Sequence, residues 1–357
     1  MLKTKFLSLA FISLLFPTLS HAQSEAGALF LTLPPGSRAN AMSAAQTALA
    51  DDIYALYFNP AGLARLQKGG AGFFHHDFGI FDLPITFVGA AYRTQFGNVG
   101  VAFNNMNINN SFLGEELNSY ERALQLTYAN QFNETIAIGG SLKWVRTSFD
   151  QPTGVPDASA NALGFDIGIL AQNLFPHWTL HKRNESFPER FRKFGRQAFQ
   201  GLAFGLALLN TGPDRLEYLV ENQGDPLPQI LRLGVAYNAL DTNEIGVLLA
   251  LDLEKELVER DENGVPDGFV KSWFTSWDNG FDNLRFGAEI NLYHIFAFRF
   301  GRDEFLNFSS GFGDNSVAEW TFGLGFGPEW ARLNLVHRGF PTGARNEKWV
   351  ADLVVSY

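Results

Sequence analysis

The last eleven residues, E-K-W-V-A-D-L-V-V-S-Y from Glu347 to Tyr357, decide the fold class. Every second residue of this stretch is apolar or aromatic, and the residues between them include two charged side chains. Successive side chains of a β-strand point to opposite faces. One face of such a strand can contact lipid while the other faces a wet interior. The stretch therefore predicts a membrane-spanning β-strand.

Thirteen earlier segments have the same strand chemistry, which gives fourteen predicted strands. In 202–208 large apolar residues alternate with Ala and Gly, and in 284–291 they also alternate with charges. A soluble β-sandwich alternates in the same way, but its outer face is seldom rich in Gly. The Gly and Ala content favours a crowded barrel interior, and hence an all-β membrane barrel of fourteen antiparallel strands. The predicted strands are 70–78, 84–94, 97–106, 121–131, 134–148, 161–173, 199–210, 229–239, 243–254, 283–291, 294–302, 318–327, 330–338 and 347–357.

The predicted connections alternate between short turns, such as Gln95-Phe96, and long loops. In outer-membrane barrels the short turns are periplasmic and the long loops extracellular. An even number of strands then places both termini on the periplasmic side, and the last strand should pair with the first near Gly70–Phe78. The terminal aromatic, Tyr357, resembles the insertion signal of bacterial outer-membrane barrels. The predicted long loops are 107–120, 149–160, 211–228, 255–282, 303–317 and 339–346.

The composition excludes several classes of function. Aromatic residues make up 14% of the chain, and 35 residues are Phe, which fits a lipid-facing barrel. The chain has no Cys, so it forms no disulfide and no thiolate metal site. The net charge of −10 argues against a nucleic-acid partner. We expect no cofactor.

The N-terminus predicts a secretory signal peptide at 1–22. Lys3 and Lys5 are followed by an apolar run over 6–19, and Ser20-His21-Ala22 supplies small residues for cleavage. The alternative, an uncleaved anchor, is disfavoured because the run is shorter than the ~20 residues of a membrane-spanning helix. The expected location is the outer membrane of a Gram-negative bacterium, after Sec export.

Residues 23–69 do not alternate, and we expect them to form a plug inside a barrel of residues 70–357. Ala41–Ala50 is rich in Ala and could be helical. Asn-Pro at Asn59-Pro60 marks a turn. The plug or gate candidates are Asp51, Asp52, Asn59, Pro60 and Ala61.

Three blocks carry a family resemblance. A-D-D-I-Y-A-L-Y-F-N-P-A-G-L-A (50–64) resembles the start of the FadL-like outer-membrane proteins, and most closely of the PorV/PorQ-type family. G-L-A-L-L-N-T-G-P (205–213) with D-P-L-P-Q-I-L-R-L-G-V-A-Y (225–237) agrees, as does F-G-A-E-I-N-L-Y-H-I-F-A-F-R-F-G (286–301). The resemblance implies a fourteen-stranded barrel with an N-terminal plug. It also implies either passage of hydrophobic compounds or a non-enzymatic role in type IX secretion.

Charged residues on the inward faces of the predicted strands are the main functional candidates. Acids and bases are mixed among them, so they can form a network that braces the barrel and plug, or they can line a path for a ligand. The bracing role is the default expectation. The lumen-facing charges are Lys143, Asp166, Arg232, Asp252, Arg285, Glu289, Arg299, Arg332 and Asp352.

The connection 174–198 is longer and more basic than a periplasmic turn should be. Phe187, Phe191 and Phe194 recur at near-helical spacing. The segment could be an amphipathic helix at the inner membrane interface, a docking site for a partner, or a solvated insertion. The candidate partner contacts are Lys182, Arg183, Arg190, Arg192, Lys193 and Arg196.

We predict no catalytic and no metal site. His75 and His76 are adjacent, so they point to opposite strand faces. The loop Asp261–Gly268 is similar to calcium loops but lacks their ligand spacing, which favours an acidic extracellular turn. No G-x-S-x-G motif occurs. Trp273 and Trp277 could belong to an aromatic girdle or to an exposed patch.

The sequence thus predicts a plugged outer-membrane barrel that acts through protein partners in type IX secretion or surface attachment. The first alternative is passive transport of long-chain fatty acids or other hydrophobic compounds. A lipid A-modifying enzyme, the second alternative, has no residue support. The expected partners are outer-membrane lipid and either secretion-system proteins or hydrophobic small molecules.

Overall fold

The structure is a computed structural model. Several sequence-based predictions lie outside the residues it describes: the signal peptide at 1–22, the first plug residues, most of the basic connection, and Tyr357. The described residues are 26–78, 83–112, 115–151, 156–182, 199–218, 224–261, 263–277, 280–303, 319–328, 330–338 and 348–356.

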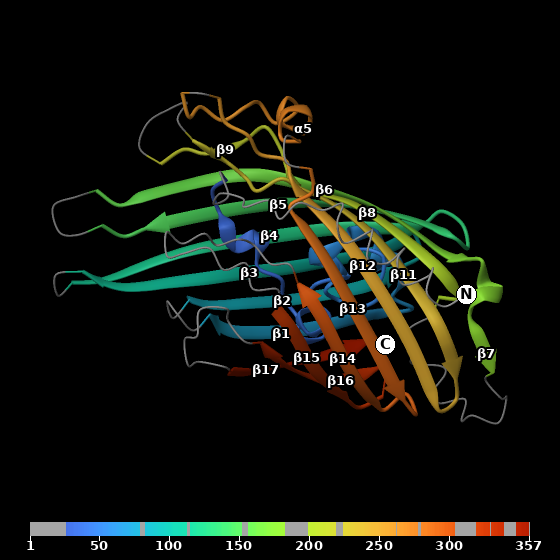
Figure 1. The fold of residues 1–357 in the computed structure, drawn as a ribbon. Coiled ribbons are helices and arrows are strands. Elements are labelled where there is room, and N and C mark those ends of the chain that lie inside the picture. The colour runs from blue at the N-terminus through green and yellow to red at the C-terminus, as the bar shows by residue number, and fades with distance from the viewer. Residues whose placement is uncertain are drawn as a thin grey trace, which may run out of the picture.

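Fourteen antiparallel strands close into a barrel (Figure 1). Each strand of the wall pairs with the next one along the chain, and β17 pairs with β1 from Gly70↔Ser356 to Phe74↔Asp352. The fourteen predicted strands and the predicted closing pair are therefore confirmed. The wall consists of β1 (Gly69–Phe78), β2 (Leu83–Thr94), β3 (Gly97–Phe112), β4 (Glu115–Gln131), β5 (Ile136–Phe149), β6 (Ala158–Leu174), β8 (Gly201–Thr211), β11 (Ile230–Thr242), β12 (Ile245–Glu256), β13 (Asn283–Leu292), β14 (Phe296–Asp303), β15 (Glu319–Phe326), β16 (Ala331–Arg338) and β17 (Lys348–Ser356).

The wall is apolar outside and small or polar inside. In β8, the side chains of Phe204 and Leu206 are 43% and 39% exposed, whereas Ala203 and Ala207 are fully buried. Exposed aromatic residues also gather at the short turns, for example Phe96 and Phe132. This distribution is the reverse of a soluble sandwich and is typical of a barrel in an outer membrane.

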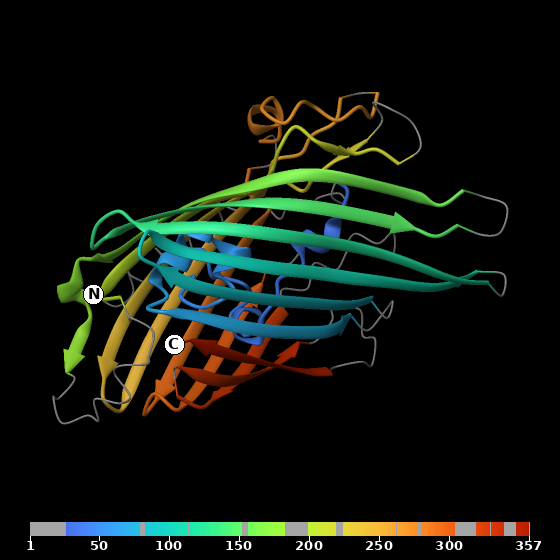
Figure 2. The ribbon, with the colours of Figure 1, turned by 180° about the vertical axis from the view of Figure 1, so that it is seen from behind.

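The prediction that residues 107–120 form a loop is wrong. β3 continues to Phe112 and β4 begins at Glu115, so the segment is a long hairpin paired from Asn107↔Tyr120 to Phe112↔Glu115. Its sequence is rich in Asn and lacks apolar alternation, but the main-chain ladder forms without it because backbone pairing does not depend on side-chain polarity. Figure 2 shows that β3 and β4, together with β5 and β6, extend beyond the other strands.

Two elements follow β6 where the sequence suggested a basic helix. They are η3 (Pro176–Trp178) and β7 (Leu180–Lys182), and β7 pairs in parallel with Leu240–Thr242 at the end of β11. Residues 176–182 are thus a single 3-10 turn followed by a short strand that extends the sheet. The helix that the spacing of Phe187, Phe191 and Phe194 suggests stays a prediction. The rest of the connection lies outside the described residues.

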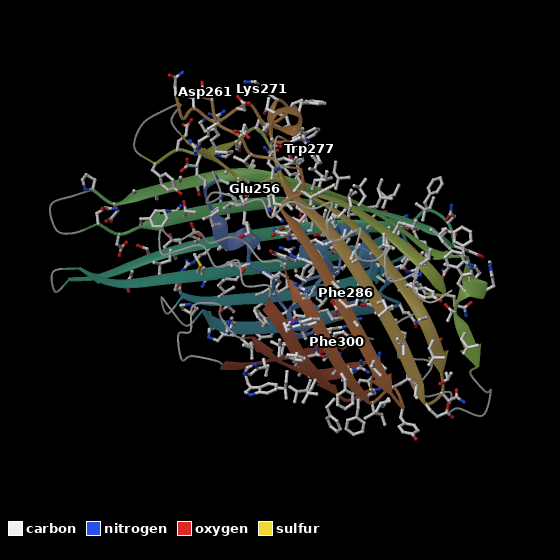
Figure 3. The ribbon with its side chains drawn as sticks, in the orientation of Figure 1. Glu256, Asp261, Lys271, Trp277, Phe286 and Phe300 are labelled. Carbon is white, nitrogen blue, oxygen red and sulfur yellow. The ribbon has the colours of Figure 1, made fainter. Side chains whose placement is uncertain are left out.

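A cap covers the other end of β8, β11 and β12, on the side of the long loops (Figure 1). It contains β9 (Arg215–Leu216), β10 (Asp225–Pro226) and α5 (Ser272–Thr275). Figure 3 shows Asp261, Lys271 and Trp277 in this cap, away from Phe286 and Phe300 on the wall. No helix in the described part of the chain is long and apolar enough to cross a membrane.

The segment before β1 lies inside the barrel (Figure 1, Figure 2). It contains η1 (Leu29–Thr32), α2 (Ser37–Ala41), α3 (Ala55–Phe58) and η2 (Pro60–Arg65). The helix expected over Ala41–Ala50 is wrong, because α2 ends at Ala41 and turns follow. The amides of Gln46 and Thr47 donate to Asp252 Oδ2 of the wall, at 2.9 and 2.8 Å, instead of to helical carbonyls.

Candidate functional site

The lumen holds two parts of the N-terminal segment, which we call the plug (residues 37–66) and the strap (residues 26–33). The plug touches the wall at glycines. A Cβ added to Gly168 would lie 2.0 Å from Asn59 Oδ1, and one added to Gly205 would lie 2.1 Å from the Thr47 carbonyl oxygen. Only glycine lets the backbone of a strand approach its neighbour this closely. The wall glycines whose added Cβ would lie within 3.1 Å of a plug atom are Gly72, Gly89, Gly100, Gly139, Gly168, Gly205, Gly234, Gly287, Gly301 and Gly323.

Asn59, Pro60 and Ala61, predicted as gate residues, are buried against β5 and β6. Asn59 Oδ1 accepts from the Ala61 amide at 3.1 Å, and Asn59 Nδ2 donates to the carbonyls of Thr47 and Ile169 at 2.9 and 3.1 Å. One side chain thus caps η2 and ties two plug turns to the wall. These contacts hold the plug in place.

Asp51 and Asp52, the other gate candidates, lie beside a buried arginine that the sequence analysis missed. Arg38 Nη1 is 2.6 Å from Asp51 and 3.6 Å from Asp52, and Arg38 Nε is 2.9 Å from Glu289 of β13. Glu289 also pairs with Arg299 of β14. A buried charge is tolerated when it is paired and hydrogen-bonded. This chain of ion pairs therefore joins the plug to two strands.

All nine predicted lumen-facing charges are buried, with at most 4% exposure. Three of the acids reach the plug: Glu289 through Arg38, Asp252 through the amides described above, and Asp352, which accepts from the Ser37 amide at 2.7 Å. Asp352 also accepts from Asn334 Nδ2 at 2.8 Å. These contacts brace the plug against β12, β13 and β17.

The other lumen charges connect strands of the wall. Glu254, which was not predicted, accepts from both Arg232 and Arg285, each at 2.6 Å. Lys143 is 3.0 Å from Asp166. Arg332 Nη1 donates to Asn291 Oδ1 at 3.0 Å beside a cavity of about 70 Å³ between the plug and the wall. Most of the acidic and basic side chains in the lumen thus pair with one another.

The upper lumen, toward the long strands and the cap, is mostly apolar, with one buried carboxyl group, Glu121, beside Phe30. Phe30 and Leu31 of the strap are buried there, at 0% and 4% exposure. The strap has a backbone bond to the cap, from the Gly27 amide to the Pro226 carbonyl at 2.9 Å. We call this space the upper compartment. It is lined by Ile85, Met106, Ala123, Val145, Ala160 and Ala162 of β2 to β6, and by Leu216 and Leu227 of the cap.

The cap loop at Asp261 has the geometry of a turn. Asp261 Oδ1 accepts from the amides of Asn263 and Val265, both at 2.9 Å. Hydrogen bonds from these amides, that of Val265 foremost, lower the pKa of Asp261. Among the described residues no group of three or more His, Cys, Asp or Glu is placed to hold a metal ion.

The remaining candidates are dispersed. His75 is exposed, and its Nδ1 lies 2.8 Å from Thr86 Oγ1 on β2. Trp273 donates to Gln229 Oε1 at 3.1 Å, and Trp277 is 38% exposed in the cap. Lys182 lies in β7, but its side chain and the residues Arg183, Arg190, Arg192, Lys193 and Arg196 lie outside the described residues. Their role as partner contacts stays a prediction.

Comparison with known proteins gives one family match and several structural likenesses. Residues 18–142, less than half of the chain, match the model described as "Uncharacterised protein family (UPF0164)". No curated protein matches the sequence.

Three solved structures illustrate the structural likenesses. The CymD monoaromatic hydrocarbon channel is 12% identical with a TM-score of 0.49, covering 91% of this chain and 98% of that one. The toluene transporter TodX of Pseudomonas putida is 11% identical with a TM-score of 0.48, covering 89% and 96%. A Pseudomonas aeruginosa FadL homologue is 9% identical with a TM-score of 0.45, covering 90% and 95%. These values are too low to carry a function across.

Proposed function

We propose that the protein passes small hydrophobic molecules across the outer membrane, and that they bind first in the upper compartment. The observation that carries this proposal is the mostly apolar lining of that compartment, which only the short strap fills, through Phe30 and Leu31. An apolar concavity with few polar groups is the usual form of a site for apolar ligands. Phe30 and Leu31 occupy it as such a ligand would.

Passage requires the strap to leave the compartment. The side chains of Phe30 and Leu31 are held by apolar contacts, which an incoming apolar molecule can replace with little net cost. The backbone of Phe30 is also hydrogen-bonded to the buried Glu121, and this bond has to break when the strap leaves. The plug below is held by ion pairs and close backbone contacts, so it sets the second barrier. A cavity of about 70 Å³ beside Arg38 and Asp51 lies along this contact between the plug and the wall.

A reversible lock on the strap tests the proposal. A Cβ on Gly27 would lie 3.0 Å from the Asp225 Cβ, and disulfide-bonded Cβ atoms are about 3.5–4.5 Å apart, so a small shift allows the bond. The chain has no other cysteine to interfere with Gly27→Cys/Asp225→Cys. In vesicles, entry of a fluorescent fatty acid should be about tenfold or more slower in the oxidised form than after reduction.

The single variant Asp225→Cys controls for the loss of the ion pair between Asp225 and Arg260. Equal entry in the oxidised and reduced double variant would contradict the proposal, because the molecule would then bypass the compartment. Entry that is absent in the unmodified protein would contradict it as well.

A second candidate function, the one favoured by the sequence, is a role through protein partners in type IX secretion or surface attachment. The close fit of plug and wall favours it, because a permanently sealed barrel serves a scaffold well. The basic stretch from Lys182 to Arg196 is then the proposed contact. A pull-down from outer membranes in mild detergent, followed by charge reversal in this stretch, separates the two functions: the strap lock should not affect partner capture.

A further inference from the structure

On the outer face of β1 to β6, the apolar surface ends along one line. One cross-strand row, directly paired in register, consists only of large apolar residues: Phe73, Val88, Phe103, Leu124, Trp144 and Leu163. Each of them is at least 40% exposed. The next outward-facing row toward the long hairpins is polar at every position: His75, Thr86, Asn105, Arg122, Arg146 and Asn161.

This line marks a level in the membrane. A lipid-facing barrel surface is apolar over the height of the hydrocarbon layer and becomes polar where the headgroups begin. The polar row lies on the side of the long hairpins and cap, which is the extracellular side by the length of its connections. The row therefore lies at the headgroups of the outer leaflet.

Two arginines stand next to each other in the polar row. Arg122 of β4 and Arg146 of β5 are direct cross-strand partners. Directly opposed residues have Cβ atoms about 4.5–5.5 Å apart, and like charges at that distance destabilise a sheet. Among the described residues, no carboxylate forms an ion pair with either of them. The repulsion is relieved if an anion lies between them.

Neutral neighbours orient both side chains. Arg122 Nε donates to Asn105 Oδ1 at 2.8 Å, and Arg146 Nε donates to the Tyr120 hydroxyl at 3.2 Å. The Arg122 guanidinium also lies 3.9 Å from the centre of the Tyr120 ring. Because the Nε atoms are used in this way, the terminal nitrogens can serve a ligand. Two guanidinium groups side by side suit the oxygens of a phosphate.

We propose that Arg122 and Arg146 bind the phosphate of a phosphorylated lipid of the outer leaflet. The acyl chains of that lipid lie along the apolar row below, on Leu124 and Trp144. The site is on the outer wall, so it is independent of the lumen and of the transport proposed above. It would fix the height and the rotational setting of the barrel in the membrane.

Binding of diphosphoryl lipid A to the detergent-purified full chain tests the proposal. Arg122→Gln/Arg146→Gln removes both charges, and Lys68→Gln/Arg93→Gln is the matched control at two exposed positions on the periplasmic side. We expect the first variant to bind at least about tenfold more weakly and the control to bind like the unmodified protein. The chemically dephosphorylated lipid should bind about as weakly as the variant does.

Three outcomes would overturn the proposal: equal binding by the variant, equal binding of the dephosphorylated lipid, or competition by inorganic phosphate as strong as that of the lipid. The last would identify a site for free phosphate instead. Heat-modifiable migration on gels verifies that each variant is folded. Arg122→Lys/Arg146→Lys, which keeps the charge but loses the guanidinium fork, should bind with intermediate strength.

Discussion

The plug and the strap belong to the same N-terminal segment and fill the same barrel, but they are held by different physics. The plug meets the wall at glycines, at backbone distance, and through buried ion pairs with the wall. The strap meets it mainly through apolar side chains, in a compartment whose lining is mostly apolar. The lower lumen is therefore shaped for one occupant, whereas the upper lumen accepts apolar surface in general. The difference indicates which part of the segment can be exchanged for a ligand.

The largest effect should come from cutting the ion pairs of the plug. Glu289→Gln leaves Arg38 and Arg299 without their shared carboxylate, and breaking a buried pair costs about 3–5 kcal/mol. Urea unfolding of the barrel in micelles should move to clearly lower urea concentrations. Glu244→Gln, at an exposed turn, is the matched control. A midpoint equal to that of the control would mean that the plug is not braced through Glu289.

The next effect should come from the close backbone contacts. A Cβ on Gly139 would lie 2.5 Å from Pro60, whereas one on its neighbour Gly140 would lie 3.4 Å from the nearest atom outside the adjacent residues. Gly139→Ala should destabilise the barrel by about 1–3 kcal/mol through overpacking, and Gly140→Ala should be close to neutral. The same unfolding measurement checks both. Equal midpoints would refute the fixed fit of the plug.

A smaller effect on the barrel is expected for the strap. Phe30→Ala removes a fully buried ring from the upper compartment. The strap can open locally, so the barrel should unfold at nearly the same urea concentration, within about 1 kcal/mol. Limited proteolysis should cut 26–33 faster, and binding of a fluorescent fatty acid should strengthen. A loss of barrel stability as large as that caused by Glu289→Gln would contradict the claim that the strap is held less firmly than the plug.

The smallest effect should come from the cap. The Lys271 ammonium donates to Asp267 at 2.6 Å, and this hydrogen bond lowers the pKa of Asp267. A carboxyl group whose pKa is lowered by folding stabilises the fold above its unfolded pKa, and the contribution is lost as the pH falls through the folded pKa. The Lys271 side chain is 64% exposed, so Lys271→Ala should leave thermal unfolding at neutral pH unchanged. A measurable shift would show that the cap contributes to the barrel.

The wall could be predicted from the sequence because an alternation of residue types with a period of two indicates a strand and also which of its side chains share a face. Parity alone assigned Lys143, Asp252 and Glu289 to the inner faces, where the structure buries them. The alternation along one strand does not indicate, however, which residues of two neighbouring strands lie opposite each other. The pairing of Arg232 and Arg285 around Glu254 depends on which residues lie opposite each other across β11, β12 and β13.

The contents of the lumen were harder to predict. Arg38 lies in a segment with no period, so nothing in its neighbourhood marks it as buried. Phe30 and Leu31 are ordinary apolar residues until the barrel closes around them. The Asn-rich hairpin at 107–120 pairs through its main chain, which side-chain patterns do not report.

The close contacts between the plug and the wall glycines have a consequence for how the barrel assembles. The plug precedes every strand of the wall in the chain, yet it contacts strands from β1 to β17. A barrel closed first would have to admit a segment that fits it at backbone distance, through a ring with no free edge. The order of the chain allows another route. In that route the plug is present first, and the strands of the wall assemble around it. The seam between β1 and β17 is then the last to close.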